Sequence, residues 1–301
     1  MVLPQVSDSK AIFLQIIQEI EQASKAENGV TGLRSGFTRL DGLTKGFQNG
    51  QVTIVGSEEA MGKTAFLMAI ARNIAFAERK VCAFISCEHN ELSLMRRLIS
   101  AEAEIHSEHI SKGVLSLAEW TKIANLENSL PWGNLILKTP PFITLDDLLI
   151  HCWELRSKNN VDCIIIDSSS FSKNISNINY SAILKALKTL AVGLDIPIML
   201  SYPLKNLTSR NPYVDLGLDD EFHKPKMEHF YSDLETVLIY ADLVMLLYRP
   251  EYYGIITLDE FGMSRQKVAE VIVPINRNGS SDTIKLKYLG SMSKFMNHEC
   301  D

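Results

Sequence analysis

The sequence predicts an α/β fold in which a mostly parallel sheet carries helices on both faces and ends in antiparallel strands. Three observations lead to this prediction. Short apolar runs alternate with amphipathic stretches of helical period from residue 32 onward. The turn Gly62-Lys63-Thr64 joins one of these runs to an apolar helical stretch, and the last apolar runs have no full-length helix between them. Strands that alternate with helices pair in parallel, because each connecting helix crosses back over the sheet.

The composition is that of an ordinary globular protein. The chain has 301 residues, 46% hydrophobic and 22% charged, which suits one large domain with an extension. We find no apolar run of about 18 residues and no signal peptide, and we expect a cytoplasmic protein that does not bind membranes. The five cysteines and seven histidines show no paired or metal-ligand spacing. A formal net charge of −6 argues against a wholly nucleic-acid-binding surface but leaves a local basic channel open.

Residues 1–30 predict a separate helix ahead of the main domain. Apolar residues recur at helical spacing over 9–26, and a polar residue at 7, 8 or 9 could cap the helix. The glycine-containing segment 26–32 ends it, so we expect the main domain at 31–296 and a short tail at 297–301. Such a helix either folds back on its own domain or packs on a neighbouring subunit, and the sequence slightly favours folding back.

The main domain alternates between predicted strands and helices. We expect strands at 51–55, 81–86, 135–137, 162–166 and 196–201, and helices near 63–77, 91–103, 117–128, 145–158 and 182–194. Later strands at 243–248, 268–275 and 283–288 should finish the sheet in antiparallel pairing. The polar segment 205–233 has little periodicity, and a loop of that length in a compact domain is usually functional or mobile.

The turn at residues 57–64 has the chemistry of a phosphate-binding loop. Its backbone N–H groups and the start of the following helix would face an anion. Lys63 would reach the β- and γ-phosphates of ATP, and the Thr64 hydroxyl would bind Mg²⁺. The further nucleotide contacts are expected from Ser57, Ala60, Met61, Gly62 and Ala65. The strict motif has glycine where Ser57 stands, so a plain strand–turn–helix corner with a surface lysine is the alternative.

Two carboxylates follow other predicted strands. Asp167 ends an apolar run, where an aspartate beside the phosphate loop would hold Mg²⁺; the alternative is an ordinary turn residue. Glu88 follows the strand after the phosphate-loop helix, and open α/β sheets bind ligands at the carboxyl ends of their strands. Glu88 could therefore polarise the water that attacks the γ-phosphate, or it could simply cap the next helix. Together with Lys63 and Thr64, both acids favour a nucleotide-hydrolysing site.

Several motifs in order give the chain a specific resemblance. They are the segments 31–41, 56–64, 86–88 with 95–98, 164–167, 241–243 with 248–253, and the Asn-Arg-Asn-Gly run at 276–279. On these motifs the chain resembles, from about residue 13 to 295, the C-terminal motor domain of the DnaB-type replicative DNA helicases, a branch of the RecA-like ATPases.

The resemblance implies a RecA-like P-loop ATPase core in a ring, normally a hexamer, with ATP and Mg²⁺ bound between subunits. Single-stranded DNA would occupy the central channel, and other replication proteins would be further partners. Arg277 matches the family's arginine finger, which reaches the γ-phosphate held by a neighbouring subunit. Arg97 matches a position near the nucleotide base, although an ordinary helix-surface arginine fits it equally well. The helix at 9–26 matches the linker helix that docks on the adjacent subunit.

The chain departs from the family pattern in several places. The family has an N-terminal domain that we expect to be absent here. Its Tyr-Leu-Gln, its Ser-Gln-Leu and the lysine beside its finger are replaced by three serines at 168–170, by Ser201-Tyr202-Pro203 and by Ile275. A tyrosine lacks the donor–acceptor pair of the glutamine amide, which calls γ-phosphate sensing into question. The phosphate loop also carries Glu58 and Glu59, which should weaken nucleotide binding unless they point to solvent.

Two functional hypotheses follow. The first is an ATP-dependent helicase or translocase that moves on single-stranded DNA in replication. The second is a DnaB-like paralogue that binds ATP as an assembly switch, with weak or no unwinding, in a replication or mobile-element machine. The retained Lys63, Glu88, Asp167 and Arg277 favour hydrolysis, whereas the altered loops favour the second hypothesis. A recombinase-like or clock-like RecA relative is a remote third, because it would lack the Arg-Asn-Gly element.

Contacts with DNA are expected from the polar segment 205–233, through Lys205, Arg210, Lys224 and Lys226. Cationic side chains along such a loop would bind backbone phosphates. The alternative is that these charges are only solvated.

Overall fold

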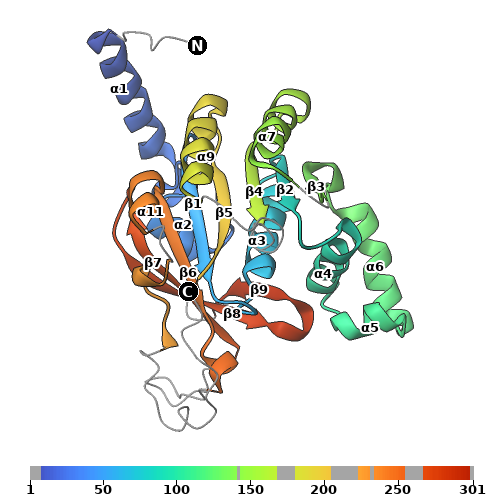
Figure 1. Cartoon of the computed structure of the whole chain (residues 1–301). Helices are drawn as coiled ribbons and strands as arrows, with labels where there is room; N and C mark the ends of the chain where they lie inside the picture. Colours follow the sequence, from blue (N-terminus) through green and yellow to red (C-terminus); the bar gives the residue numbers. More distant parts are fainter. Residues whose placement is uncertain are drawn as a thin grey trace.

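A computed structural model describes residues 8–140, 143–167, 180–204, 223–230, 234–254 and 267–298. Its strands are β1 (Val52–Ser57), β2 (Cys82–Ser86), β3 (Leu135–Lys138), β4 (Cys163–Asp167), β5 (Ile198–Pro203), β6 (Leu243–Tyr248), β7 (Val268–Asn276), β8 (Asp282–Leu289) and β9 (Lys294–Asn297). Within the described residues they form one nine-stranded sheet in the order β3-β2-β4-β5-β1-β6-β7-β8-β9 (Figure 1). In this sheet order, the first six strands, β3 through β6, pair in parallel. Strands β7, β8 and β9 follow in antiparallel pairing. The predicted fold class is confirmed.

Helices connect the parallel strands, as the alternating pattern predicts. They are α1 (Ser9–Lys25), α2 (Thr38–Thr44), α3 (Lys63–Arg72), α4 (Glu91–Ala103), α5 (Ser107–Lys112), α6 (Leu117–Ser129), α7 (Leu145–Asn159), α9 (Tyr180–Leu194) and α11 (Leu234–Tyr240). Short helical turns lie at Glu27–Gly29, Asn73–Ala77, Trp132–Asn134, Met227–His229, Pro250–Tyr253 and Gly290–Met292. Every expected helix and strand is present with small differences at its ends, and α2, α5, α11 and β9 come in addition.

Side-chain caps explain where several helices begin. The Thr144 hydroxyl accepts a hydrogen bond from the backbone of Asp147, whose carboxylate accepts one from Thr144 in return, ahead of α7. Ser116 and Glu119 form the same reciprocal pair at α6. Such a pair satisfies backbone N–H groups that have no partner inside the helix. These helix starts are therefore set by local sequence.

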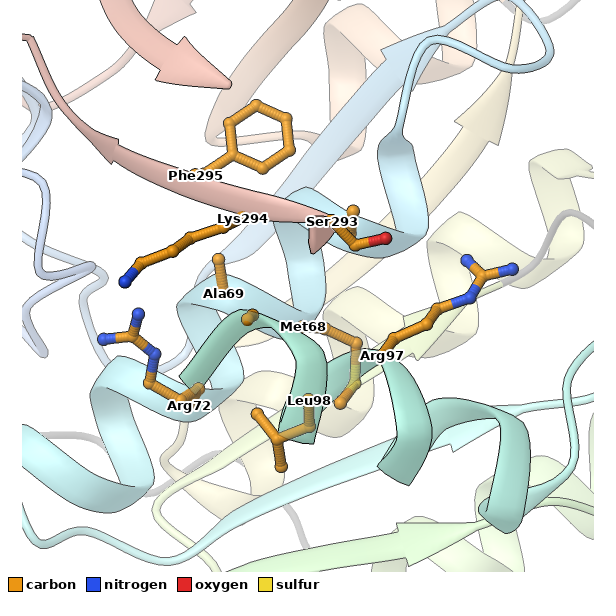
Figure 2. A pocket seen from close by; sticks show the side chains of 10 residues that line it. Met68, Ala69, Arg72, Arg97, Leu98, Ser293, Lys294 and Phe295 are labelled. Atoms are coloured by element: carbon orange, nitrogen blue, oxygen red, sulfur yellow. The ribbon is translucent and has the colours of Figure 1, made fainter. Parts of the chain in front are cut away.

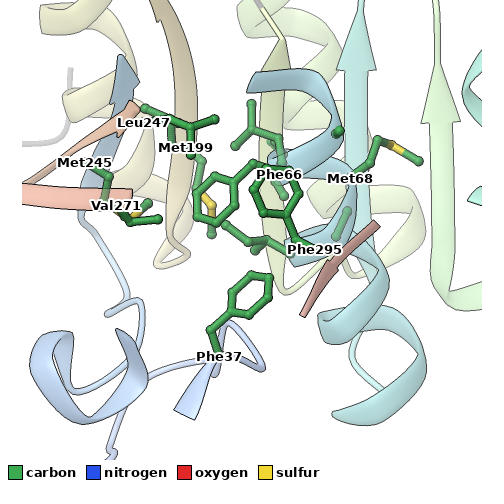
Figure 3. Close-up of a cluster of buried hydrophobic side chains, with 14 of the residues drawn as sticks. Phe37, Phe66, Met68, Met199, Met245, Leu247, Val271 and Phe295 are labelled. Atoms are coloured by element: carbon green, nitrogen blue, oxygen red, sulfur yellow. The ribbon is translucent and has the colours of Figure 1, made fainter. Parts of the chain in front are cut away.

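The core has one apolar cluster on each side of the sheet. One joins α3 and α4 with the antiparallel strands, and Figure 3 shows Phe37, Phe66 and Phe295 meeting within it. The other packs α7, α9 and α11 against the opposite face. All six residues of β1 are buried, because a central parallel strand is covered on both faces. The phosphate-loop strand is thus held at the centre of the molecule.

The prediction that the N-terminal helix folds back on its own domain is wrong. Helix α1 projects away from the sheet (Figure 1), and the Phe13 side chain on it is 61% exposed. Its other exposed apolar residues are Ile12, Leu14, Ile16, Ile17 and Ile20. Within the described residues, other helices pack on both faces of the sheet. An exposed apolar stripe of this kind marks an interaction surface.

The composition raised two further points that the structure addresses. Among the described residues, no helix combines the length and the hydropathy that a bilayer crossing requires. The cysteines that the structure describes, Cys82, Cys87, Cys152 and Cys163, are free thiols. Burial raises the pKa of the Cys152 thiol to about 12, so this sulfur stays protonated and unreactive.

Replacing Phe66 with alanine should lower the free energy of unfolding by about 3–5 kcal/mol, as expected for a fully buried phenylalanine. The Phe66 ring is 0% exposed and lies 5.7 Å from the Phe37 ring and 5.4 Å from the Phe295 ring. Urea unfolding measures the loss. Trp153→Ala, which removes a ring whose residue is 60% exposed, is the matched control and should change the value by no more than about 0.5 kcal/mol. Similar losses in the two variants would contradict this assignment of the core.

Candidate functional site

The loop between β1 and α3 turns sharply so that the start of α3 faces outward. β1 ends at Ser57 and α3 begins at Lys63. Gly62, which precedes α3, has φ of +96°, and Ala60 has φ of +63°. Glycine adopts such left-handed backbone without a steric cost, whereas other residues are strained there. The free N–H groups of the first turn of α3 therefore open toward the loop, an arrangement that can bind an anion.

The Lys63 ammonium is held inside this loop. The side chain is 7% exposed, and Nζ donates to the carbonyls of Ser57 at 2.8 Å and Glu58 at 3.0 Å and to the Ser57 hydroxyl at 3.1 Å. Burial lowers the pKa of Lys63 to about 8, against the opposing pull of nearby carboxylates such as Asp167 and Glu59. The loop thus holds a buried cation that donates its hydrogen bonds to oxygen atoms of the loop itself.

Thr64 and Asp167 meet behind the loop. The Thr64 hydroxyl donates to Asp167 Oδ2 at 2.8 Å, and the Ser201 hydroxyl donates to Oδ1 at 2.9 Å. Strand β4 brings Asp167 next to Ser86 of β2. Hydroxyl and carboxylate oxygens are the ligands that Mg²⁺ prefers, usually alongside water and substrate phosphates. Among the described residues no group of three or more His, Cys, Asp or Glu is placed to hold a metal ion.

A cleft of about 590 Å³ opens over the loop. Its lining includes most of the predicted residues, namely Ala60, Gly62, Lys63, Thr64, Ala65, Glu88 and Arg97. Ser57 and Met61 are buried and do not line it; Ser57 instead holds the Lys63 ammonium, and Met61 packs in the core. Asp167 lies beneath the cleft, against Thr64.

Glu88 is an exposed carboxylate in the wall of this cleft. The alternative role, capping the next helix, belongs to another residue. The Asn90 side chain is the N-cap of α4 and accepts a hydrogen bond from the Ser93 backbone at 2.8 Å. Glu88 is therefore left facing the cleft, at the carboxyl end of β2.

Arg97 on α4 separates the cleft from a small cavity of about 20 Å³ between α3, α4 and β9. Figure 2 shows Arg72 and Lys294 on one side of this cavity and the Arg97 side chain pointing away from both. Arg72 pairs with Glu102 and Lys294 with Glu104, at 2.8 and 2.6 Å. Arg97 extends instead along the wall of the larger cleft.

Sequence reasoning missed Tyr288, which lines the cleft from β8. A Cβ atom at Gly62 would lie 3.7 Å from the Tyr288 ring. The Arg249 guanidinium lies over that ring, 4.4 Å from its centroid, and also donates to the Ala60 carbonyl at 3.4 Å. Burial raises the pKa of Tyr288, so its hydroxyl stays neutral. The only sequence signal near this position was the motif at 248–253, which contains Arg249. That motif does not reveal that Arg249 lies over the ring of Tyr288.

Arg277 lies outside the cleft of its own chain. Strand β7 runs antiparallel to β6 and pairs Asn276 with Leu243, at the start of β6. Arg277 therefore lies at the edge of the sheet where β1 begins, opposite the edge where the phosphate loop lies. Its Nη2 donates to the carbonyls of Leu238 at 3.1 Å and Ile239 at 2.9 Å, and its side chain is 47% exposed.

Comparison with known proteins identifies the family. The model of the DnaB-like helicase C-terminal domain matches residues 32–297. The chain belongs to this family. The expected resemblance to DnaB-type helicases is thereby confirmed over the main domain.

Relatives of known name agree with this membership. The chain is 28% identical over 296 residues to the replicative DNA helicase DnaB of Geobacillus stearothermophilus, covering 96% of this chain and 62% of that protein. It is 30% identical to the DnaB of Haemophilus influenzae, covering 93% of this chain and 59% of the relative. The chain thus spans less than two thirds of the length of these relatives.

Solved structures establish the fold. A separately solved ATPase domain aligns with a TM-score of 0.78 at 22% identity, over 97% of this chain and 100% of that one. A DnaB-like replicative helicase, whose structure was determined together with its interactions with primase, aligns with a TM-score of 0.73 at 22% identity, over 98% of this chain and 68% of that one. The predicted RecA-like ATPase fold is confirmed.

The departures from the DnaB pattern lie in recognisable places. The ring of Tyr202 is 0% exposed and packs against Tyr180 at 4.6 Å and Phe230 at 4.8 Å, so this side chain turns into the core. Ile275 also packs against that core cluster. Glu59 lines the cleft, whereas Glu58 is buried in the loop. The serines at 168–170 lie outside the described residues.

The buried Lys63 should make stability depend on pH. Its pKa is about 8 in the folded chain and 10.5 as the reference value, so between these values the unfolded chain binds more protons. Stability relative to a Lys63→Met variant should therefore rise between pH 8 and 10, by about 1–2 kcal/mol. Urea unfolding at fixed pH measures both proteins, with Lys185→Met as the control for loss of an exposed positive charge. A difference between wild type and Lys63→Met that stays constant with pH would overturn this view of the loop.

Proposed function

We propose that this DnaB-like domain binds ATP with Mg²⁺ and hydrolyses it as part of a hexameric ring that acts as a helicase on single-stranded DNA in replication. One observation carries the proposal. A single cleft at the carboxyl ends of parallel strands combines the buried Lys63, the Thr64–Asp167 pair and the exposed Glu88. Family membership, which implies nucleotide use, supports it.

Different residues of the cleft are assigned to the phosphates and to the metal ion. ATP would supply the γ-phosphoryl group, and Mg²⁺ would neutralise charge on the phosphates. Lys63 and the N–H groups at the start of α3 are assigned to the phosphates, since both face the same cleft. Thr64 and Asp167 are assigned to the metal, because their oxygen atoms are already 2.8 Å apart. The Ser201 hydroxyl, bonded to the other oxygen of Asp167, would hold that carboxylate in place.

Glu88 is assigned to the attacking water. Its carboxylate is exposed in the cleft wall and is not used as the cap of α4. A carboxylate within reach of water can orient it and accept its proton as the bond to phosphorus forms.

Arg97 is assigned to the nucleoside. It lines the cleft from α4, and a planar guanidinium stacks well on a purine base. Tyr288 also lines the cleft, but its ring is buried between Arg249 and Phe295, so it is assigned to support the loop at Gly62 instead.

Two features favour assembly with a second copy of the chain. Arg277 lies at the sheet edge opposite the phosphate loop, and the apolar stripe of α1 is exposed. A head-to-tail interface would bring Arg277 of one subunit to the cleft of the next and would cover α1 at the same time. Interfaces of this type close into rings.

Only two of the four residues predicted to contact DNA lie within the described structure. Lys205 and Arg210 lie outside the described residues. The Lys224 ammonium lies 3.5 Å from the buried carboxylate of Glu270, so its charge is engaged within the chain. Lys226 is exposed and remains the better candidate for phosphate contact. The names of the relatives, replicative DNA helicases, favour an unwinding function over the assembly-switch hypothesis.

Lys63→Ala and Glu88→Gln should each abolish ATP hydrolysis, with rates reduced by about a hundredfold or more. Lys63→Ala should also weaken nucleotide binding, whereas Glu88→Gln should retain it, because only the water-directing group is changed. Phosphate release with and without single-stranded DNA measures the rate, and stimulation by DNA supports the helicase over the switch. Glu91→Gln, which removes an exposed carboxylate just inside α4, is the matched control. Turnover that survives both substitutions would remove the assigned site.

Arg277→Ala should leave nucleotide binding nearly intact but lower hydrolysis in the oligomer by about a thousandfold, because a trans arginine stabilises charge that develops only during transfer. Mixing Arg277→Ala with Lys63→Ala subunits tests the trans geometry. Interfaces that combine the intact Arg277 of one subunit with the intact Lys63 of the other should recover activity. A monomer that hydrolyses ATP at the full rate would exclude this role.

A further inference from the structure

A buried carboxylate, Asp242, connects Arg277 to the strand that carries the phosphate loop. Asp242 lies between α11 and β6 and is 5% exposed. Its backbone N–H donates to the Val52 carbonyl at 2.9 Å, and the Val52 N–H donates to Asp242 Oδ2, also at 2.9 Å. Val52 is the first residue of β1. The carboxylate is thus fixed to the start of the strand that ends at the phosphate loop.

Two cations approach this carboxylate from different elements. Lys188 on α9 donates to Asp242 Oδ2 at 2.7 Å and to the Gly50 carbonyl at 2.9 Å. Arg277 Nη1 lies 3.9 Å from Oδ1, and the Arg277 backbone N–H donates to the Asp242 carbonyl at 3.0 Å. Oδ2 is therefore occupied by two donors, and Oδ1 is the oxygen that faces Arg277. Charge interactions are strengthened where side chains are withdrawn from water.

The turn that carries Arg277 is itself fixed. The Asn276 side chain donates to the carbonyls of Leu43 and Ser280, at 3.0 and 3.1 Å. Asn278 and Gln51 exchange amide hydrogen bonds of 2.9 and 3.0 Å, which tie the turn to the residue before β1. The backbone of Arg277 is therefore held on both sides. What remains to be set is the direction of its half-exposed guanidinium.

We propose that Asp242 is the positioning residue that aims Arg277 at the nucleotide of the neighbouring subunit. The inference rests on the trans role of Arg277 in the proposed function. The carbonyls of Leu238 and Ile239 hold the guanidinium as neutral acceptors, and Asp242 adds the one negative charge found near it in the described structure. Without that charge, Lys188 and Arg277 would be left as two cations at one site, and Arg277 would move outward.

Asp242→Asn tests this, because it keeps the size of the side chain and removes its charge. In the assembled oligomer kcat should fall on the order of tenfold, since a displacement of about 1 Å can cost up to a hundredfold. The dissociation constant for nucleotide should change less than about twofold, because Asp242 lies at the opposite sheet edge from the cleft. In an Arg277→Ala background the same substitution should have no further effect on kcat, as expected for residues that act as one unit.

A second substitution sharpens the test. Adding Lys188→Gln to Asp242→Asn should restore part of the lost kcat, because the repelling cation is gone. Asp242→Glu keeps the negative charge, so its kcat should fall less than that of Asp242→Asn. If Asp242→Asn does not fold, as judged by urea unfolding, Asp242→Glu carries the test, and its loss of kcat must disappear when Arg277 is alanine.

The outcomes separate this inference from the function on which it rests. If Arg277→Ala leaves turnover unchanged, the trans role fails and the inference fails with it. If Arg277→Ala slows turnover but Asp242→Asn does not, only the role of Asp242 is excluded. An Asp242→Asn loss that is equally large without Arg277, or that appears in nucleotide affinity, would show a merely structural role.

Discussion

The buried ammonium of Lys63 is the interaction on which the rest of the site depends. A charge withdrawn from water is costly unless acceptors surround it, and here the carbonyls of Ser57 and Glu58 and the Ser57 hydroxyl supply them. These acceptors exist only because β1 ends in a tight loop at the centre of the sheet, between β5 and β6. The core that fixes β1 therefore also fixes the cation.

The direction of each strand decides what reaches the cleft. Parallel pairing of β2, β4, β5 and β1 brings Glu88, Asp167, Ser201 and Lys63 to one edge. Glu88 and Lys63 follow their strands, Asp167 ends one and Ser201 lies near the end of another, and all these strands point the same way. Strand β7 reverses direction and carries Arg277 to the other edge. One chain thus holds the groups that we assign to the phosphates and to the attacking water at one end of its sheet and Arg277 at the other. The Asp242 network joins the two ends through β1.

The positions that depart from the DnaB pattern differ in whether their side chains reach the cleft. Tyr202 packs in the aromatic core between Tyr180 and Phe230 and does not line the cleft. Glu59 remains in the cleft wall and adds negative charge where phosphates would bind.

The sequence by itself determined the α/β class, most of the helices and strands, and the places of Lys63, Glu88 and Asp167 after or at the ends of strands, because periodicity, helix caps and strand-end motifs are local signals. Only the tertiary structure decided that α1 projects outward, that Tyr202 turns inward and that Tyr288 lines the cleft. It also decided that Arg277 lies at the far edge beside Asp242. Each of these features depends on which surfaces of the sheet other helices and strands cover, and on pairing between strands far apart in the chain. A local stretch of sequence contains neither kind of information.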